Sequence, residues 1–145
     1  MAFLNVCYRG NLVGKTYKNT YDRDGRVTRQ AMITGGEYVY FYDPQNRLVR
    51  VTDNLGAEVK YTYNSIGKRT EEKRKINGEE TQYIKYAYDA AGRLRERAEK
   101  RNPKRNRKWW AITSYAYDGD GNITEIQLPD GSKMQHHRSR GWQWQ

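Results

Sequence analysis

Aspartates recur along the sequence at a fixed place in a short motif, and rows of aligned carboxylates can bind cations. The four aspartates of this kind are Asp22, Asp43, Asp89 and Asp118. Each directly follows a tyrosine, and a glycine or an asparagine comes three residues later. At this position an Asx side chain can cap a turn by accepting hydrogen bonds from backbone N–H groups. Calcium loops need dense oxygen ligands, and only DGDGN at residues 118–122 comes near that pattern. We therefore interpret the acids as turn residues and predict no metal site, and we keep residues 118–122 as the one calcium candidate.

Aromatic and basic side chains accompany the acids. Thirteen tyrosines could stack on sugars or nucleic acid bases. However, leucine, isoleucine, valine and phenylalanine together number only 22 residues, so tyrosine has to supply much of a half-polar core. We therefore favour core filling over ligand contact. One basic residue per turn is expected to pair with the turn acid or to lie on a tyrosine ring; these are Arg26, Arg47, Lys68 and Arg93.

A second candidate site is the basic segment KRNPKRNRKWW at residues 100–110. Positive charge beside flat rings is what single-stranded nucleic acid binds. The candidate ligand-binding residues are Lys104, Arg105, Arg107, Lys108, Trp109 and Trp110. The competing interpretation is a solvated hairpin tip, because Asn102-Pro103 marks a turn.

Side chains suited to catalysis are sparse. His136 and His137 are adjacent, which is not the spacing of the usual zinc motifs, and Cys7 has no basic partner nearby in sequence. Pairing of Cys7 with a residue distant in sequence stays open. The sequence predicts no enzyme and no cofactor.

The motif occurs five times, beginning at Tyr21, Tyr42, Tyr63, Tyr88 and Tyr117. The copies read YDRDGRV, YDPQNRL, YNSIGKR, YDAAGRL and YDGDGNI. Glycine or asparagine near the end of each copy can adopt the positive φ that closes a reversal. The predicted turn residues are Asp22, Gly25, Asp43, Asn46, Asn64, Gly67, Asp89, Gly92, Asp118 and Gly121.

The elements that must position these turns are β-strands. Apolar and polar residues alternate before and after each copy, and TDNLG at 52–56, INGE at 76–79 and LPDGS at 128–132 are further reversals. The segments 68–75 and 93–101 contain good helix formers but no apolar helical stripe, so we predict strands there as well. The predicted organisation is an amino-terminal segment at 1–16, a repeat array at 17–132 and an atypical tail at 133–145.

Tandem Tyr-Asp-x-x-Gly-Arg-Leu units spaced about twenty residues apart resemble the YD repeats of bacterial Rhs proteins and related wall-associated proteins. The resemblance implies tandem antiparallel β-hairpins in a curled, open sheet, which in full-length relatives forms a hollow shell around a carboxy-terminal toxin. It also implies a role in polymorphic-toxin competition between bacteria, and carbohydrate binding has been attached to the repeat. The chain departs from the pattern at Arg69, where an aliphatic residue belongs, and it is too short for a closed shell, so a repeat-region fragment is expected.

The sequence therefore predicts an all-β, non-enzymatic repeat module, with a carbohydrate- or nucleic-acid-binding module as the alternative. Expected partners are the rest of an Rhs chain or a toxin cargo, and open sheet edges would favour self-association. No apolar run is long enough for a membrane span, and the amino end lacks the features of a secretory signal. The cytoplasm and export through a specialised secretion system both stay open.

Overall fold

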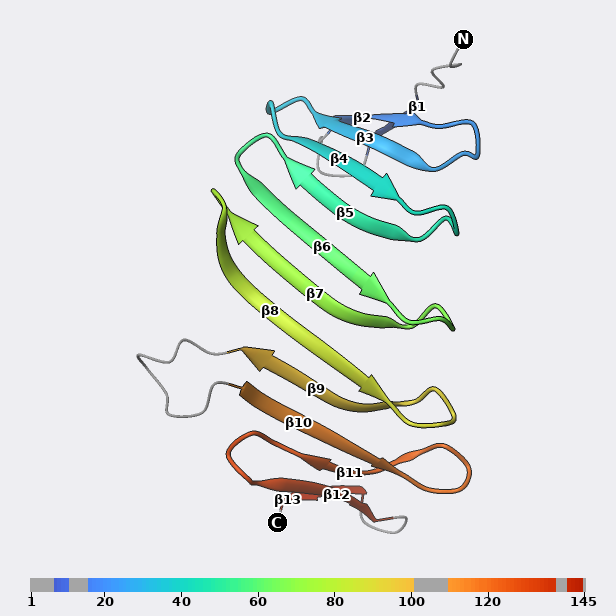
Figure 1. Ribbon diagram of the computed structural model, residues 1–145, viewed down its shortest axis with the longest axis vertical. Helices are drawn as coiled ribbons and strands as arrows, with labels where there is room; N and C mark the ends of the chain where they lie inside the picture. The colour runs from blue at the N-terminus through green and yellow to red at the C-terminus, as the bar shows by residue number, and fades with distance from the viewer. Residues whose placement is uncertain (1–6, 11–15, 101–109, 138–140, 145) are drawn as a thin grey trace. The chain divides into compact units, whose positions relative to one another are not determined.

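The computed structural model describes residues 7–10, 16–100, 110–137 and 141–144. Every regular element within these ranges is a β-strand, so the all-β prediction is confirmed (Figure 1). The chain divides into two compact units. Unit 1 comprises Met1–Thr62 and Lys73–Thr81, and unit 2 comprises Tyr63–Glu72 and Gln82–Gln145.

Unit 1 is an antiparallel array in which each strand pairs with the next one in sequence. Its strands are β1 (Cys7–Gly10), β2 (Thr16–Tyr21), β3 (Val27–Met32), β4 (Glu37–Tyr42), β5 (Leu48–Asp53) and β6 (Ala57–Tyr63). The next two strands, β7 (Arg69–Ile76) and β8 (Glu79–Tyr88), contribute residues to both units.

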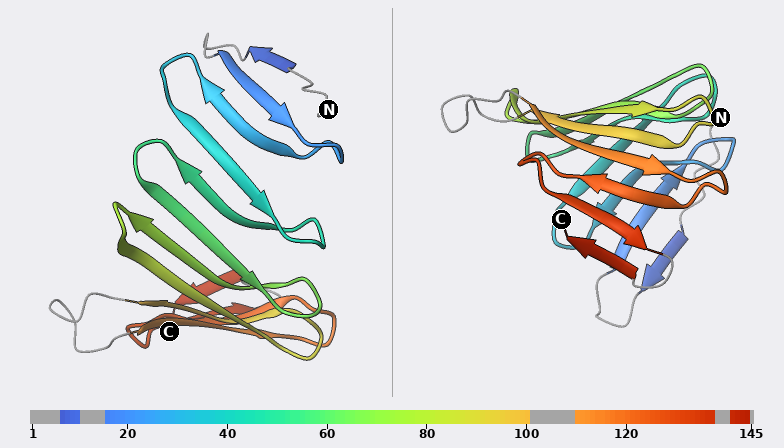
Figure 2. Two further views of the ribbon diagram at one scale, coloured as in Figure 1. Left: turned by 45° about the horizontal axis from the view of Figure 1, so that its top comes forward. Right: turned by 90° about the horizontal axis from the view of Figure 1, so that it is seen from below.

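Unit 2 continues with the same antiparallel pairing from β8 onward, which Figure 2 shows from two further directions. Its remaining strands are β9 (Leu94–Lys100), β10 (Trp110–Tyr117), β11 (Ile123–Gln127), β12 (Lys133–His137) and β13 (Gly141–Trp144). The prediction of tandem antiparallel hairpins is therefore confirmed.

The five copies of the motif form the turns that join β2 to β3, β4 to β5, β6 to β7, β8 to β9 and β10 to β11. We call these the repeat turns, numbered one to five. The reversals between copies, which we call return turns, join each hairpin to the next. Within each unit, repeat turns lie at one end of the strands and return turns at the other (Figure 1).

The interior of each unit is thin. Among the described residues, only Ile84, Ala111 and Glu72 are buried, with exposed fractions of 4%, 7% and 6%. The tyrosines of the strands are mostly half-buried. Because so few aliphatic side chains are enclosed, contacts between neighbouring hairpins must supply much of the stability.

The two segments that contain good helix formers are strands, as predicted. Residues 69–75 lie on β7 and residues 94–100 lie on β9. Strand pairing also extends outside the 17–132 array, since β1 pairs with β2 and β12 with β11. No helix that could cross a membrane occurs in the described part of the chain.

Candidate functional site

The carboxylate or amide at the second motif position closes every repeat turn. In the first turn, Asp22 Oδ1 accepts hydrogen bonds from the backbone N–H groups of Asp24 and Arg26, both at 3.0 Å. The same pair of bonds is made by Asp43, Asn64, Asp89 and Asp118, at 2.9 to 3.2 Å. The acids that could have bound cations therefore serve as acceptors for the backbone.

The fifth motif position has the left-handed backbone conformation that such a reversal needs. The φ angles are 78° at Gly25, 63° at Asn46, 78° at Gly67, 77° at Gly92 and 87° at Gly121. Asparagine tolerates this region better than other residues with a Cβ, which explains why Asn46 can replace glycine in the second turn.

The basic residue at the sixth position pairs with the acid of its own turn. Arg26 Nε lies 2.7 Å from Asp22 Oδ2, and the equivalent distances are 2.7 Å for Arg47 and 2.8 Å for Arg93. The third and fifth turns differ, because Lys68 and Asn122 occupy this position. Asn122 is the shorter substitute, and its Nδ2 lies 3.2 Å from Asp118 Oδ2.

These contacts favour the ionised form of the turn acids. Partial burial alone would raise the pKa of Asp22, but hydrogen bonds from the backbone and guanidinium of Arg26 outweigh it and hold the pKa below the ordinary value of an aspartate. The pKa of Asp43 is lowered in the same way by Arg47, against the same effect of burial. For Asp89 the largest cause of the lowered pKa is the backbone N–H of Arg93, followed by its guanidinium.

The tyrosine at the first position connects its hairpin to the preceding one. Tyr42 Oη donates a hydrogen bond to the carbonyl oxygen of Val27 at 2.8 Å. Two further copies repeat this bond, from Tyr88 to Arg69 at 2.6 Å and from Tyr117 to Leu94 at 2.7 Å. In each case the acceptor is the seventh residue of the previous motif. Burial raises the pKa of Tyr42 and of Tyr88, which keeps both hydroxyls protonated as donors.

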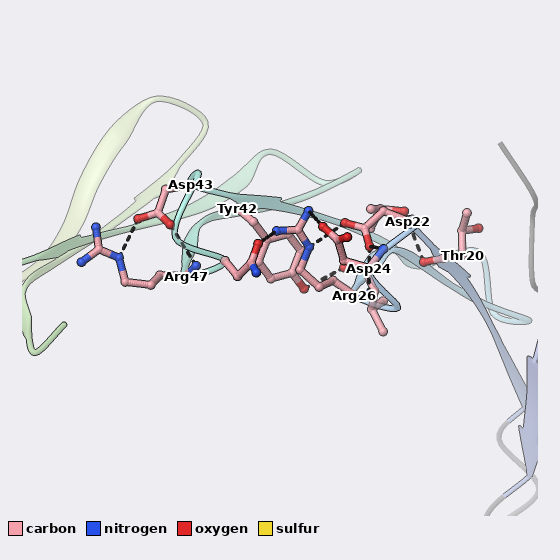
Figure 3. A network of polar contacts seen from close by, with 10 residues as sticks. Thr20, Asp22, Asp24, Arg26, Tyr42, Asp43 and Arg47 are labelled. Atoms are coloured by element: carbon pink, nitrogen blue, oxygen red, sulfur yellow. Dashed lines mark hydrogen bonds and ion pairs between the residues drawn. The ribbon is translucent and has the colours of Figure 1, made fainter. Parts of the chain in front are cut away.

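The arginines strengthen the same connection. Arg26 Cζ lies 4.9 Å from the ring centroid of Tyr42, and Arg93 Cζ lies 4.7 Å from that of Tyr117. Both guanidinium groups also reach the next repeat turn, because Arg26 donates to Asn46 Oδ1 and Arg93 donates to the carbonyl of Asp118. Figure 3 shows Arg26 between Asp22 and the ring of Tyr42. Each of these two arginines thus stabilises its own turn and also contacts the following hairpin.

A β-bulge accompanies the motif tyrosine, and sequence analysis missed it. In the second repeat, Phe41 pairs with Arg50 but Tyr42 pairs with Leu48, so Val49 has no opposite residue. The same irregularity precedes Tyr21, Tyr88 and Tyr117. A bulge increases the local twist and changes where nearby side chains point.

Return turns in unit 1 are also joined to one another, through residues that sequence analysis did not single out. Asp53 Oδ1 accepts the N–H groups of Leu55 and Ala57 at 2.9 and 2.7 Å. Asn54 Nδ2 donates to the carbonyl of Gly35 at 2.8 Å. The N–H of Asn77 donates to the carbonyl of Gly56, also at 2.8 Å. The only available signal was the Asp-Asn pair of TDNLG, which is ordinary turn chemistry.

Most of the predicted basic ligand site lies outside the described residues, namely Lys104, Arg105, Arg107, Lys108 and Trp109. The sixth residue, Trp110, begins β10 and is half-buried. Its ring meets that of Tyr83 edge to face at 5.3 Å. Lys85 Nζ lies 5.2 Å from the Trp110 ring and 5.3 Å from the Tyr83 ring.

The calcium candidate at 118–122 gains no support from the structure. Within the described ranges, no three His, Cys, Asp or Glu side chains are grouped so that they could hold a metal ion. Both carboxylate oxygens of Asp118 accept hydrogen bonds within the turn itself.

Comparison with known proteins gives one family model that matches part of the repeat array. The family model for the RHS repeat matches residues 42–75, which span the second and third repeat turns. No curated protein sequence matched the chain.

Solved structures share this fold. The TcdB2-TccC3-Cdc42 crystal structure has a TM-score of 0.65 and 23% identity over 79% of this chain. TcdB2-TccC3-TEV has a TM-score of 0.66 and 20% identity over 85% of this chain. A Photorhabdus luminescens Tc holotoxin pore with a mutated TccC3 has a TM-score of 0.62 and 22% identity over 79% of this chain. The chain spans only 5–6% of the length of these chains, and at such identities the likeness concerns the fold.

Proposed function

Because this chain carries an RHS repeat and is an Rhs-type repeat module, we propose that it is a non-enzymatic wall segment of a shell that encloses a toxin used in competition between bacteria. The observation that carries this proposal is the use of the motif side chains. Aspartate, arginine and tyrosine are the repeated side chains that could take part in binding or catalysis. In the described turns they bind each other or the backbone. A wall needs such self-contained contacts, whereas an active site needs groups that face a substrate.

The strands are mostly half-buried, which is consistent with a wall that encloses another polypeptide. Large shells require hairpins that can be added in series without a separate core for each one. Here neighbouring hairpins are joined by the backbone ladder, with a motif tyrosine added in three cases and an arginine in two. The structural neighbours are complexes that contain TcdB2 and TccC3. By analogy, we propose that this chain associates with further RHS-type chains and with a toxin cargo.

Protease protection in producing bacteria tests this proposal. The chain would be tagged, cross-linked in the cells and purified, and co-purifying proteins would be identified by mass spectrometry. We expect an RHS-type protein with a toxin domain among the co-purifying proteins. In a second experiment the gene for this chain is deleted. We expect the toxin in the deletion strain to be more sensitive to protease, and we expect the strain to compete less well in co-culture with a susceptible competitor. Unchanged toxin protection and unchanged competition in the deletion strain would contradict the wall function.

Two matched sets of substitutions distinguish loss of the wall function from a lower amount of the protein. Complementation with Tyr42→Phe, Tyr88→Phe and Tyr117→Phe together removes three hydroxyls that join hairpins and leaves the aromatic rings. Complementation with Tyr38→Phe, Tyr86→Phe and Tyr115→Phe removes three other strand tyrosine hydroxyls. We expect the first set to restore toxin protection less well than the second at equal protein abundance.

Nucleic acid binding is the second candidate, and one observation favours it. Trp110, Tyr83 and Lys85 form an aromatic and cationic cluster at the beginning of β10, directly after the basic segment in sequence. Titration with single-stranded DNA at low and high salt tests this candidate. Binding through the basic residues should weaken steeply as salt rises, whereas glycan binding should respond little.

A further inference from the structure

Three exposed aliphatic side chains lie along one end of unit 1, at its described return turns. Ile33 lies in the turn between β3 and β4, Leu55 lies in the turn between β5 and β6, and Ile76 ends β7. Their exposed fractions are 77%, 77% and 51%. All three turns belong to unit 1 and lie at the same end of its strands (Figure 1). We call Ile33, Leu55 and Ile76 the return-turn row.

An exposed aliphatic tip buries little surface within its own unit. Turns ordinarily use glycine, asparagine, aspartate or serine at their exposed positions. One exposed aliphatic side chain needs no explanation, but a row of them at successive turns is typical of a surface that meets another protein. The described return turn of unit 2, at 128–132, differs, because Leu128 there is half-buried.

Hydrogen bonds hold the three turns in register. Asn54 Nδ2 donates to the carbonyl of Gly35 at 2.8 Å, and Asn54 Oδ1 accepts the N–H of Glu37 at 3.1 Å. The N–H of Asn77 donates to the carbonyl of Gly56 at 2.8 Å. Neighbouring strands are about 4.8 Å apart, so successive return turns, two strands apart, lie about 10 Å from each other. The row therefore presents its aliphatic tips at a regular spacing.

Ion pairs neutralise part of the acidic charge near the first two turns. Glu37 Oε2 lies 2.5 Å from Arg29 Nη2, and Glu58 Oε1 lies 3.3 Å from Lys60 Nζ. The third turn is more acidic, because residues 75–80 contain one basic and two acidic side chains. Negative charge is thus greatest at one end of the row.

We propose that the return-turn row is a docking surface for the same row on a second copy of this chain. A partner for such a row must offer apolar recesses at the same spacing. A second row does so, because its tips can enter the gaps between the tips of the first, as side chains of facing sheets interdigitate. The contact is isologous, with a two-fold axis between the rows.

Charge favours an antiparallel alignment of the two rows. In a parallel alignment, residues 75–80 of the two copies would meet, and their net negative charges would repel each other. In the antiparallel alignment, that turn meets the turn of Ile33 on the other copy, where Glu37 already has its arginine. The two Leu55 side chains then lie near the axis.

The size of the row makes this a weak dimer. Three aliphatic tips offer a few hundred Å² of apolar surface, whereas a stable complex buries roughly 800 Å² per partner. The net charge of +10 also opposes the approach of two copies at low ionic strength, and salt screens this repulsion. We therefore expect the dimer at high protein concentration and moderate salt.

Cysteine cross-linking tests the alignment, in a Cys7→Ser background and with a short bis-maleimide. Leu55→Cys chains should join to one another. A mixture of Ile33→Cys and Ile76→Cys chains, one of them isotopically labelled, should give several-fold more mixed dimer than either variant gives alone. Ile66→Cys is the matched control and should give only background, because Ile66 is 66% exposed but lies in the third repeat turn.

Sedimentation equilibrium measures the affinity. Leu55→Ser should weaken the dimer about 10-fold or more, because the dimer loses two leucine side chains at its axis. Ile66→Ser should change the affinity by less than about 2-fold. Both positions are exposed, so both variants should keep the melting temperature of the wild type, and the difference then concerns association alone.

The proposal does not depend on the wall function, because these measurements use the purified chain and no toxin. Equal affinity of Leu55→Ser and the wild type would overturn it and assign self-association to the strand edges. Ile33→Cys chains that join to one another as readily as to Ile76→Cys chains would contradict the antiparallel rows. Absence of any dimer at high protein concentration would show that a second copy does not cover the row.

Discussion

At the scale of single residues, the repeat turn depends on a residue at its fifth position that tolerates a positive φ, which is glycine in four of the five turns. Gly92 has a φ of 77°, and a Cβ built there meets no atom closer than Lys68 Cε at 3.7 Å. Space is therefore available, and the cost of a side chain comes from the backbone conformation. Gly92→Val should destabilise the protein by about 1–3 kcal/mol, as measured by urea unfolding. Gly92→Asn is the control and should cost much less, because Asn46 adopts a φ of 63° at the same motif position. Equal stability of the valine variant and the wild type would contradict the turn geometry.

The turn acids should set the acid stability of the protein. The pKa values of Asp22, Asp43 and Asp89 are lowered from the ordinary value of an aspartate in the folded state. A lowered pKa contributes stability that is complete above the unfolded pKa and is lost as pH falls through the folded pKa. We therefore expect the melting temperature to fall as pH is lowered below about 4.

Replacing the three acids together by asparagine isolates this effect. Asn64 already makes the two backbone hydrogen bonds of the turn, so asparagine can close the reversal. The triple variant should be less stable at neutral pH, because the arginine pairs are lost, and its melting temperature should change less between pH 5 and pH 2. A triple variant with the same acid dependence as the wild type would show that these carboxylates do not cause it.

The residue types of the turn were predictable, but the partner of the motif tyrosine was not. An Asx acceptor and a glycine with positive φ act over four residues, so their roles follow from local sequence. The tyrosine hydroxyl finds its acceptor 15, 19 or 23 residues away, and the choice depends on strand register. The bulge beside the tyrosine was not predictable either, because no residue type marks a bulge at this position.

At the scale of elements, neighbouring return turns should depend on a close contact between Gly56 and Asn77. Gly56 has a φ of 91°, and a Cβ at this position would overlap Asn77 Oδ1. Gly56→Ala should therefore be more destabilising than Gly67→Ala, because Gly67 has a φ of 78° but no atom within 4 Å of its built Cβ. The free energy of unfolding in urea would be compared between the two variants. Gly67→Ala gives the loss of stability that comes from the positive φ without a close contact. Equal losses would mean that the two return turns do not contact each other.

The strands themselves were predictable even where residue propensities favoured helix. Residues 93–101 consist largely of good helix formers, yet β9 forms because its charged residues find cross-strand or same-strand partners. Glu99 accepts a hydrogen bond from Gln82 at 2.7 Å and pairs with Arg97 at 3.0 Å. The continuation of strands after residue 132 was harder to predict, since the motif ends there. Backbone pairing does not need the motif, and Glu125 holds β12 through Lys133 and Gln135 at 3.0 and 2.8 Å.

At the scale of the whole molecule, the net charge and the two edges of the described strand order act in opposite directions. The net charge is +10, and β1 begins the strand order while β13 ends it. Exposed edges recruit further strands, and like charge opposes this at low ionic strength. We expect a monomer at low salt and larger species as salt rises, measured by light scattering coupled to size exclusion. A monomer at both salt concentrations would indicate that the edges do not pair.

The central claim is that the motif tyrosines hold hairpins together and are not ligand groups. The most direct measurement is the free energy of unfolding in urea of the variant with Tyr42→Phe, Tyr88→Phe and Tyr117→Phe. Each lost hydroxyl should cost about 0.5–1.5 kcal/mol, so the triple variant should lose about 1.5–4.5 kcal/mol if the sites are additive. The matched variant with Tyr38→Phe, Tyr86→Phe and Tyr115→Phe should lose clearly less, because those hydroxyls make no hydrogen bond to another described residue. Equal stability of the two triple variants would contradict the account.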